Sequence, residues 1–310
     1  MTIGVVILTL NAANDLAYCV KYIQKSRGVN KVLVLDSSSI DSTSTLSRSL
    51  GLDFHLLPRF QFNHGATREL ARKLLGTDIV VMLTQDAFAT GTESISDLVA
   101  PLLDGRADVA YGRQLPKAGA DVFESFPREF NYSVQSQIRR LSDAPQLGAF
   151  TFFCSDSFAA YKQSSLDAIG GFPTVLTNED YFAVARILEN GGAIAYVAEA
   201  TVLHSHRYTL KEEFQRYFDT GYVRGERPWV QKLVGNAEAH GASMVKALFK
   251  RLLKTQPWLM PYAILQVGAK WLGYRIGFYS IHAPLWWKQA LSGQKYYWTS
   301  KYATQPSDIK

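Results

Sequence analysis

Continuous apolar runs alternate with amphipathic stretches over the first 115 residues. The apolar runs predict strands at 3–8, 31–35, 54–57, 79–83 and 109–111. The stretches between them predict helices at 15–25, with Asn14 as a cap, and at 41–50, 66–75 and 92–103. Because the strands are apolar throughout, we expect an α/β fold with a mostly parallel sheet and helices on both faces.

The pattern changes after residue 115. Proline and glycine recur over residues 116–150, which predict a long insertion with one helix near 130–141. Strand character returns at 150–161, 194–197 and 201–204, with a helix at 180–188 between them. Beyond residue 208 the pattern is helical, at 210–224, 243–253 and 257–280. We expect a domain of residues 1–225, with halves of about 1–115 and 116–225, and a helical extension of residues 226–310.

Composition places the chain among globular proteins. It has 310 residues, 47% of them hydrophobic and 19% charged. The apolar N-terminus lacks the basic segment and the cleavage site of a signal peptide, and no apolar run reaches the length of a membrane span. Cys19 and Cys154 are isolated in the sequence, which favours a reducing, cytoplasmic setting.

Charge is unevenly distributed along the chain. The net charge is +6, but residues 241–310 hold ten Lys or Arg residues against one acid, Asp308, and five of the six tryptophans. This asymmetry favours a partner of opposite sign, either anionic lipid or nucleic acid, and the alternative is a solvated basic face. No recognised nucleic-acid motif accompanies the charge, so we expect no nucleic-acid partner.

Polar residues follow directly after three of the predicted strands, at 9–11, 36–39 and 85–86. Open α/β sheets bind ligands at this edge. The chain contains no GxGxxG motif, no phosphate-binding GxxxxGK[ST] motif and no serine nucleophile elbow. The chemistry therefore rests on acids and histidines at the ends of strands and helices.

Each of these residues also has a structural interpretation. Asp36 and Asp41 in a serine-rich turn are typical of turn and capping residues, and Asp86 could cap the next helix. Glu179 and Asp180 suit a first helical turn, and only one of two adjacent helical residues can face a given site.

His204 and His206 would share one face of a strand, which suits a metal pair. Neither a cysteine nor a third histidine accompanies them, so we do not expect a dedicated zinc site.

At these positions the chain resembles the family 2 glycosyltransferases of the GT-A fold, and most closely the bacterial rhamnosyltransferases that use a dTDP-sugar. The resemblance covers roughly residues 1–225. It rests on LTLN (8–11), VLDSSSIDST (34–43), RFQFNHGATRELA (59–71), LTQDA (83–87), FCSDSFAAYK (153–162), GGF (170–172), TNEDYF (177–182) and HSHRYTLKEEFQRYFDTG (204–221).

The resemblance implies an inverting transfer of L-rhamnose from dTDP-β-L-rhamnose to a lipid-linked surface glycan, such as an O-antigen or a cell-wall glycan. Asp180 would be the general base, and Asp86 with His204 would hold Mg²⁺ or Mn²⁺. The residues implied for donor binding are Thr9, Asn11, Asp36, Ser38, Asp41, Asn63, His64, Arg68 and Gln85. Those implied for acceptor binding or secondary roles are Glu179, His206 and Arg207.

Three positions depart from the family pattern. Ala87 follows Gln85–Asp86 where another acid is common, which leaves few protein ligands for a metal ion. Glu69 and Asp156 stand where the rhamnosyltransferase branch often has asparagine. The departures at Glu69 and Asp156 bear on the preference for sugar and acceptor.

Two alternative functions stay open at this point. One is transfer from another nucleotide sugar, such as a UDP-hexose, and the other is a module that binds nucleotide sugar or membrane without turnover. We expect a cytoplasmic enzyme that is peripheral on the inner face of the plasma membrane, where residues 241–310 would dock. The alternative is that the tryptophans pack on the catalytic domain or form the interface of a homodimer.

Overall fold

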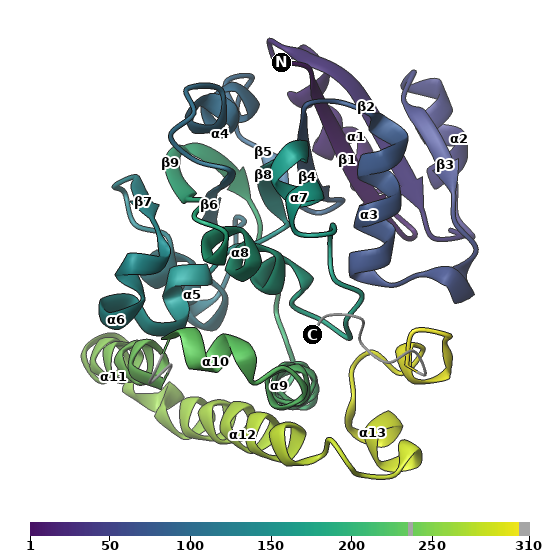
Figure 1. Cartoon of the computed structure of the whole chain (residues 1–310). Coiled ribbons are helices and arrows are strands. Elements are labelled where there is room, and N and C mark those ends of the chain that lie inside the picture. Colours follow the sequence, from purple (N-terminus) through teal and green to yellow (C-terminus); the bar gives the residue numbers. More distant parts are fainter. Residues whose placement is uncertain (235–237, 304–310) are drawn as a thin grey trace. The chain divides into compact units, whose positions relative to one another are not determined.

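The computed structural model describes residues 1–234 and 238–303 (Figure 1). The chain forms two compact units. The sheet unit comprises Met1–Leu141, Phe152–Pro173 and Asp180–Ser205. The helical unit comprises Ser142–Thr151, Thr174–Glu179 and the chain from His206 onward. The predicted boundary at residue 225 falls in the last turn of a helix, α9 (Leu210–Glu226).

Nine described strands form one sheet in the sheet unit, in the order β3-β2-β1-β4-β8-β6-β9-β5, with β7 paired to β9. The first four strands along this path, β3, β2, β1 and β4, run parallel to one another, and β8 runs antiparallel to β4 and β6. The strands are β1 (Ile3–Thr9), β2 (Val29–Asp36), β3 (Asp53–Leu56), β4 (Ile79–Thr84), β5 (Phe88–Ala89), β6 (Val109–Leu115), β7 (Gln137–Arg139), β8 (Phe158–Lys162) and β9 (Ile194–Leu203).

Strand register brings the polar strand ends together. Thr9 pairs with Asp36 at the end of β1 and β2, and Leu8 pairs with Thr84 at the end of β4. Strands β6 and β9 run parallel to each other and, through β8, in the same direction as β4. Residues that follow β1, β2, β4 and β9 therefore meet at one edge of the sheet.

Helices cover both faces of the sheet, as predicted. Val5, Ile7 and Val81 point to one face, where they share a core with α1 and α4, and α3 contacts β1, β2 and β4. The helices of this unit are α1 (Leu16–Val20), α2 (Thr43–Ser49), α3 (His64–Leu75), α4 (Ser94–Leu103), α5 (Val122–Asn131), α7 (Gln163–Ala168) and α8 (Glu179–Glu189). Its 3-10 helices are η1 (Ile23–Lys25), η2 (Arg59–Gln61), η3 (Leu141–Asp143) and η4 (Gly148–Phe152). Three of these elements, α8, η3 and η4, include residues of both units.

The predictions for local elements are wrong at four places. The helix expected near 130–141 is α5, which begins earlier because Asp121 accepts hydrogen bonds from two N–H groups of its first turn. The strand expected at 150–161 is only β8, since η4 precedes it. The two strands expected at 194–197 and 201–204 are the single strand β9. The helix expected at 15–25 is divided into α1 and η1, and the side chain of Asn14 does not cap it.

In the helical unit, α9 (Leu210–Glu226) and α12 (Met260–Tyr279) pack side by side (Figure 1). Glycines allow their backbones to approach closely. A Cβ atom on Gly277 would lie 2.0 Å from the carbonyl oxygen of Phe218, and one on Gly221 would lie 2.1 Å from that of Tyr274. The other helices of this unit are α6 (Ala144–Leu147), α10 (Trp229–Val234), α11 (Glu238–Thr255) and α13 (Leu285–Leu291), with the 3-10 helices η5 (Pro257–Leu259) and η6 (Tyr297–Thr299).

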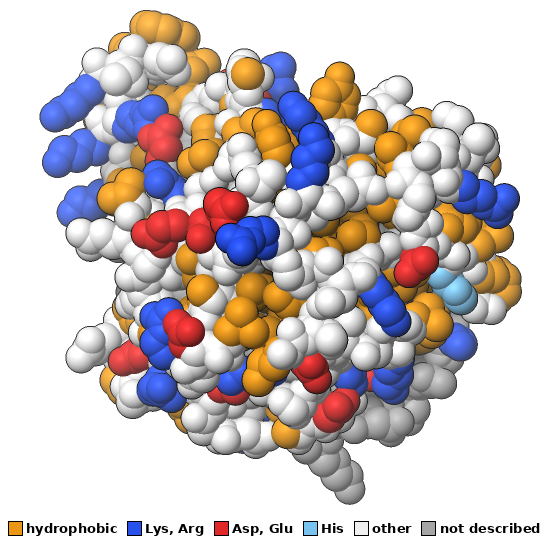
Figure 2. Space-filling view, turned by 90° about the horizontal axis from the view of Figure 1, so that it is seen from above, with side chains coloured by type: hydrophobic (Ala, Val, Ile, Leu, Met, Phe, Trp, Pro, Cys, Tyr) orange, Lys and Arg blue, Asp and Glu red, His pale blue; other side chains and the backbone are white. Residues whose placement is uncertain are grey.

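Among the helices of the described ranges, none combines the length and the apolar character that crossing a bilayer requires. On the face of the molecule drawn in Figure 2, Lys and Arg side chains are interspersed with Asp and Glu side chains over most of the described surface.

The α9–α12 contact yields a test of stability. Gly277→Ala should destabilise the protein by about 1–3 kcal/mol, because its methyl group would overlap a carbonyl oxygen of α9. Gly268→Ala, on the same helix, is the matched control, since a Cβ there would meet no atom within 4 Å apart from the neighbouring backbone of α12 itself. It should be neutral or raise stability by up to about 1 kcal/mol through helix propensity. Urea denaturation of both variants checks this, and equal stabilities would contradict the close approach.

Candidate active site

Asp36 ends β2 with a buried carboxylate, of which 1% is exposed. Its Oδ1 accepts a hydrogen bond from the Thr9 hydroxyl at 2.9 Å, and its Oδ2 accepts one from the Ser39 N–H at 2.8 Å. The carboxylate thus joins the ends of β1 and β2. Asp36 therefore does stabilise the turn after β2, as its serine-rich surroundings in the sequence suggested. The same hydrogen bonds hold its carboxylate at the carboxyl edge of the sheet.

The loops that follow β1 and β2 interlock. Asn11 and Ser38 adopt left-handed backbone conformations, with φ of 52° and 63°. The Asn11 N–H donates to the Ser39 hydroxyl at 2.7 Å, and the Asn11 side-chain oxygen accepts from the Ile40 N–H at 3.0 Å. The Ser38 hydroxyl donates to the carbonyl of Leu57 at 2.9 Å. These contacts give both loops a defined shape.

Asp41 closes the second loop. Its carboxylate accepts from the N–H groups of Ala13 and Thr43, each at 3.0 Å, and from the Thr43 hydroxyl. The hydrogen bond from the Thr43 side chain lowers the pKa of Asp41 below its ordinary value. Asp41 is exposed, so its capping role keeps an ionised group at the surface of this loop.

Helix α3 presents three of the predicted donor-binding residues. Asn63 is its N-cap, and its side chain accepts from the Ala66 N–H at 3.0 Å. His64 is half-buried, with its ring 4.9 Å from that of Phe62. Arg68 is buried, and its Nε lies 2.8 Å from Oδ2 of Asp156. The Arg68 guanidinium is thereby fixed in position inside the sheet unit.

Asp156 also connects to the predicted base. Its other oxygen accepts from the Tyr161 hydroxyl at 2.6 Å, and its N–H donates to Oδ2 of Asp180 at 3.4 Å. The Tyr181 N–H donates to Oδ1 of Asp180 at 2.7 Å. Asp180 is half-buried, whereas only 5% of Glu179 is exposed. Of the two adjacent acids, Asp180 is thus the more accessible, and N–H groups orient both of its oxygens.

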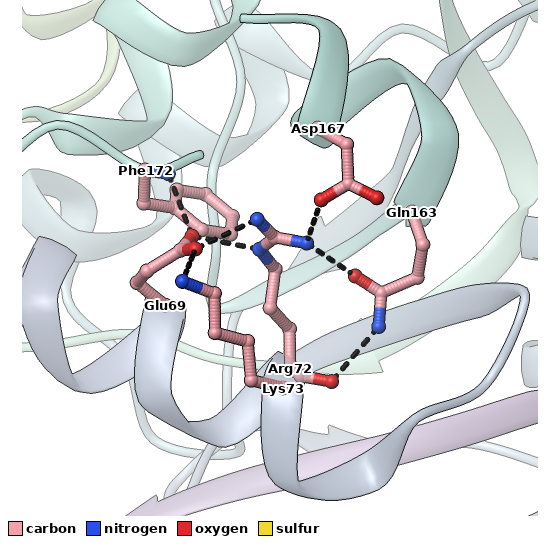
Figure 3. A network of polar contacts seen from close by, with 6 residues as sticks. All are labelled: Glu69, Arg72, Lys73, Gln163, Asp167 and Phe172. Atoms are coloured by element: carbon pink, nitrogen blue, oxygen red, sulfur yellow. Dashed lines mark hydrogen bonds and ion pairs between the residues drawn. The ribbon is translucent and has the colours of Figure 1, made fainter. Parts of the chain in front are cut away.

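A polar network holds α3 against α7 and against residues 170–172 (Figure 3). Arg72 lies 2.7 Å from Glu69 and 2.8 Å from Asp167, and Glu69 also accepts the Phe172 N–H at 3.0 Å. Gly171 has φ of 92°, and a Cβ there would lie 2.3 Å from the Glu69 carboxylate. Burial raises the pKa of Glu69, but hydrogen bonds from Arg72 and Lys73 outweigh it and leave the pKa below its ordinary value.

Asp86 and His204 meet because short strand β5 pairs antiparallel with the end of β9. This pairing sets Phe88 opposite Leu203, so Asp86 and His204 lie at the same end of the pair. Oδ2 of Asp86 is 3.5 Å from Nε2 of His204, and both side chains are largely buried. Each of these two side chains offers one ligand atom for a metal ion. The carboxylate oxygen of Asp86 is a hard ligand of the kind that Mg²⁺ and Mn²⁺ favour, and the imidazole nitrogen of His204 supplies a second ligand atom.

The remaining predicted residues have simpler surroundings. The side-chain amide of Gln85 binds the backbone of Leu10 at both ends, at 2.8 and 3.2 Å, and so joins β4 to β1. Arg207 is exposed, and the ring of His206 lies 5.5 Å from that of Tyr208. Asp86 does not cap α4, whose N-cap is Glu93.

Sequence reasoning missed Gln114, whose side chain contacts His204 from β6 at 2.9 Å. The strand predicted at 109–111 was too short to include Gln114, because β6 continues to Leu115. The only signal for Gln114 in the sequence was a polar residue just beyond that predicted strand.

Comparison with known proteins gives a family match over half of the chain. Residues 4–170 match the family model described as Glycosyl transferase family 2. The chain belongs to glycosyl transferase family 2. The resemblance stated from the sequence is therefore confirmed, and with it the expectation of a glycosyltransferase.

Curated relatives extend the match over nearly the whole chain. The O-antigen chain rhamnosyltransferase RfbN of Salmonella typhimurium is 40% identical over 285 residues, which cover 91% of this chain and 90% of RfbN. The O-antigen chain rhamnosyltransferase WbaN of Salmonella anatum is 38% identical over 284 residues, with the same coverage of 91% and 90%.

Solved structures support the fold. The mannosyltransferase PcManGT from Pyrobaculum calidifontis, solved in complex with GDP-Man and Mn²⁺, has a TM-score of 0.61 and 18% identity. The match covers 91% of this chain and 87% of PcManGT. The expected GT-A fold with a C-terminal helical region is confirmed.

The network around Glu69 yields a prediction with a defined pH dependence. Glu69→Gln should destabilise the protein by about 2 kcal/mol at neutral pH, because buried Arg72 loses one of its two charged partners. The folded-state pKa of Glu69 is lowered, so its contribution is present above the ordinary value of 4.5 and is lost as pH falls through the folded value. The difference between the two proteins should therefore narrow in acid.

Lys73→Ala is the control for this prediction, because the Lys73 side chain is 65% exposed where it pairs with Glu69. It should change stability by less than about 1 kcal/mol. Chemical denaturation at several pH values measures all three proteins. A difference between wild type and Glu69→Gln that grows in acid would show that the sign is wrong.

Proposed function

We propose that this protein is an inverting rhamnosyltransferase that transfers L-rhamnose from dTDP-β-L-rhamnose to a lipid-linked surface glycan. The observation that carries the proposal is the 40% identity, over 91% of the chain, to a protein named as an O-antigen chain rhamnosyltransferase. The acceptor would accordingly be a growing O-antigen or a related surface polysaccharide.

In this proposal the donor nucleoside binds at the ends of β1 and β2, where Thr9, Asn11, Asp36, Ser38 and Asp41 gather. The support is that these residues form two loops of defined shape at the carboxyl edge of parallel strands, where α/β proteins bind nucleotides. Arg68, Asn63, His64 and Gln85 would complete the donor site. The planar guanidinium of Arg68 suits a base or a diphosphate.

Asp86 and His204 would hold a divalent cation, and His206 keeps a secondary role. The fit rests on a carboxylate oxygen and an imidazole nitrogen that face each other at 3.5 Å in a largely buried position. A bound Mg²⁺ or Mn²⁺ supplies positive charge that stabilises the leaving diphosphate. Asp86 and His204 would orient that charge at the end of β4, next to the proposed nucleoside site.

Asp180 would act as the general base that takes the proton from the acceptor hydroxyl. The support is its accessibility at the start of α8 and the two N–H groups that orient its oxygens. Hydrogen bonds from N–H groups favour the ionised carboxylate, which is the form that accepts a proton. Glu179 and Arg207 would serve the acceptor side.

A panel of dTDP- and UDP-sugars tests the donor assignment directly. Thermal unfolding is recorded with each sugar nucleotide, with and without Mg²⁺, since a ligand that binds the folded state raises stability by mass action. We expect dTDP-β-L-rhamnose with Mg²⁺ to give the largest increase. A larger increase with a UDP-hexose would favour the alternative donor. Binding of dTDP-rhamnose without turnover on an acceptor would favour a binding module.

The base assignment predicts different effects for two neighbouring acids. Asp180→Asn should leave donor binding nearly unchanged and lower turnover by roughly 10²–10⁴-fold, because the amide cannot accept the proton. Glu179→Gln is the matched control and should keep most of the activity. Steady-state kinetics with donor and acceptor measures both variants. Wild-type turnover in Asp180→Asn together with a large loss in Glu179→Gln would place the base one residue earlier.

The helical unit would dock on the cytoplasmic face of the membrane. One face of α12 is apolar and exposed: Ile264 is 57% exposed, Leu265 60%, Trp271 64% and Leu272 46%. These residues are one, six, seven or eight positions apart and so lie along one side of the helix. Trp258 and Trp286, outside α12, are also exposed, at 70% and 66%. Tryptophan favours the headgroup layer of a bilayer.

Charge favours lipid over a second copy of the chain as the occupant of this face. Residues 241–303 contain nine Lys or Arg residues and no acid. Two such segments facing each other would repel, whereas each basic residue near an anionic membrane contributes about 1 kcal/mol. A homodimer through this face is therefore the weaker alternative.

Liposome co-sedimentation tests this docking in the full-length protein. Wild type should pellet with vesicles of anionic phospholipid at low salt, and the double variant Ile264→Glu, Trp271→Glu should stay in the supernatant. Val134→Glu is the control, because Val134 is an exposed apolar residue of the sheet unit, at 71% exposure. Pelleting of the double variant at the wild-type level, or no pelleting of wild type, would reject the α12 face as the docking surface.

A further inference from the structure

The side chain of Gln114 lies buried beside His204. Gln114 belongs to β6, pairs with Val202 of β9 and is 2% exposed. Its Oε1 lies 2.9 Å from Nδ1 of His204, and its Nε2 donates to the Ser155 hydroxyl at 2.8 Å. The Ser155 hydroxyl in turn is hydrogen-bonded to the side chain of Tyr132. Gln114 therefore connects the imidazole to a buried polar chain inside the sheet unit.

This arrangement defines which ring nitrogen carries the proton. An amide oxygen can only accept a hydrogen bond, so Nδ1 of His204 must be the donor. A neutral imidazole has a single N–H, which leaves the lone pair on Nε2. Nε2 is the nitrogen that lies 3.5 Å from Oδ2 of Asp86. The lone pair therefore faces the carboxylate.

The backbone of His204 is held as firmly as its ring. Its N–H donates to the carbonyl of Leu115 at 2.8 Å, and its carbonyl accepts from Nε of Arg128 at 2.9 Å. Leu115 is the residue directly after Gln114 in β6. One short segment of β6 thus fixes both the main chain and the imidazole of His204.

We infer that Gln114 is a positioning residue that keeps His204 in the Nδ1–H tautomer, so that Nε2 ligates a divalent cation together with Asp86. The inference rests on the metal role proposed above for Asp86 and His204. Partners of this kind orient ligating histidines in metal sites, and their loss typically weakens metal binding by about 10–100-fold.

The tautomer can be measured without metal or substrate. Long-range ¹⁵N–¹H spectra of ¹⁵N-histidine-labelled full-length protein distinguish Nδ1–H from Nε2–H, and the His204→Gln spectrum assigns the signal. At alkaline pH, where the imidazole is neutral, wild type should show His204 as the Nδ1–H form. Gln114→Leu should lose this preference, and Gln114→Glu should keep it, because its carboxylate still accepts from Nδ1. An Nδ1–H form that persists in Gln114→Leu would overturn the inference.

Metal binding supplies the second readout. Mn²⁺ is titrated into each protein in the presence of dTDP, and the free ion is counted by its electron paramagnetic resonance signal. Gln114→Leu should bind Mn²⁺ about 10–100-fold more weakly than wild type, and Gln114→Glu should bind within a few-fold of it. Gln266→Leu is the control for loss of a buried glutamine, since Gln266 is 3% exposed and donates to Glu213 in the helical unit. It should leave Mn²⁺ affinity unchanged.

The outcomes separate this inference from the proposed function. Wild-type Mn²⁺ affinity in a folded Gln114→Leu protein overturns the role of Gln114 alone. Absence of Mn²⁺ binding in wild type overturns the metal role of Asp86 and His204 as well. An equal loss in Gln114→Leu and Gln114→Glu would show that Gln114 acts through packing, and would also overturn the tautomer argument.

Discussion

A carboxylate that faces an imidazole nitrogen inside a protein requires positive charge, either on the imidazole or on a cation between the two groups. Asp86 and His204 meet this condition at 3.5 Å, although 118 positions separate them in the sequence. The contact depends on β5, whose pairing with the end of β9 sets Phe88 opposite Leu203. It also depends on β6, which supplies Gln114 and the backbone partner of His204. The mixed half of the sheet thus serves to bring these two groups together.

The parallel half of the sheet uses its carboxylates differently. Asp36 and Asp41 accept hydrogen bonds from hydroxyl and N–H groups of their own loops. The sequence allowed two interpretations of Asp36 and Asp41, as turn or capping residues and as residues that bind the donor. In the folded chain the two are compatible, because the same contacts that cap the loops also fix their shape at the edge where we propose the nucleoside binds. Gln85 adds to this by joining β4 to β1.

Local sequence predicted the parallel half of the sheet well. Strands β1 to β4 are apolar runs whose burial on both faces leaves a clear signal, and the polar residues after them identify the edge. Strands β5 and β8 and helix α5 were missed or displaced, because two-residue β5 and five-residue β8 depend on partners far along the chain.

In the candidate site, too, some residues could be identified from local sequence and others only from contacts between distant parts of the chain. Asp36, Asp86 and Asp180 follow strands or open a helix and could be identified from the sequence and the family resemblance. Gln114 could not, because only the register of β6 with β9 sets it beside His204. Glu69 appeared in the sequence as a departure from the family pattern, and its place in a buried network with Arg72 became visible only in the folded chain.

The most direct test of the account is the dependence of rhamnosyl transfer on a divalent cation. Purified protein is incubated with dTDP-β-L-rhamnose and membranes that contain lipid-linked glycan acceptors, and release of dTDP is measured in excess EDTA and after addition of Mn²⁺ or Mg²⁺. We expect release to fall to background in EDTA and to return with either ion in wild type but not in Asp86→Ala. Full activity in EDTA would contradict it, and would transfer the electrostatic role to Arg68 and His204.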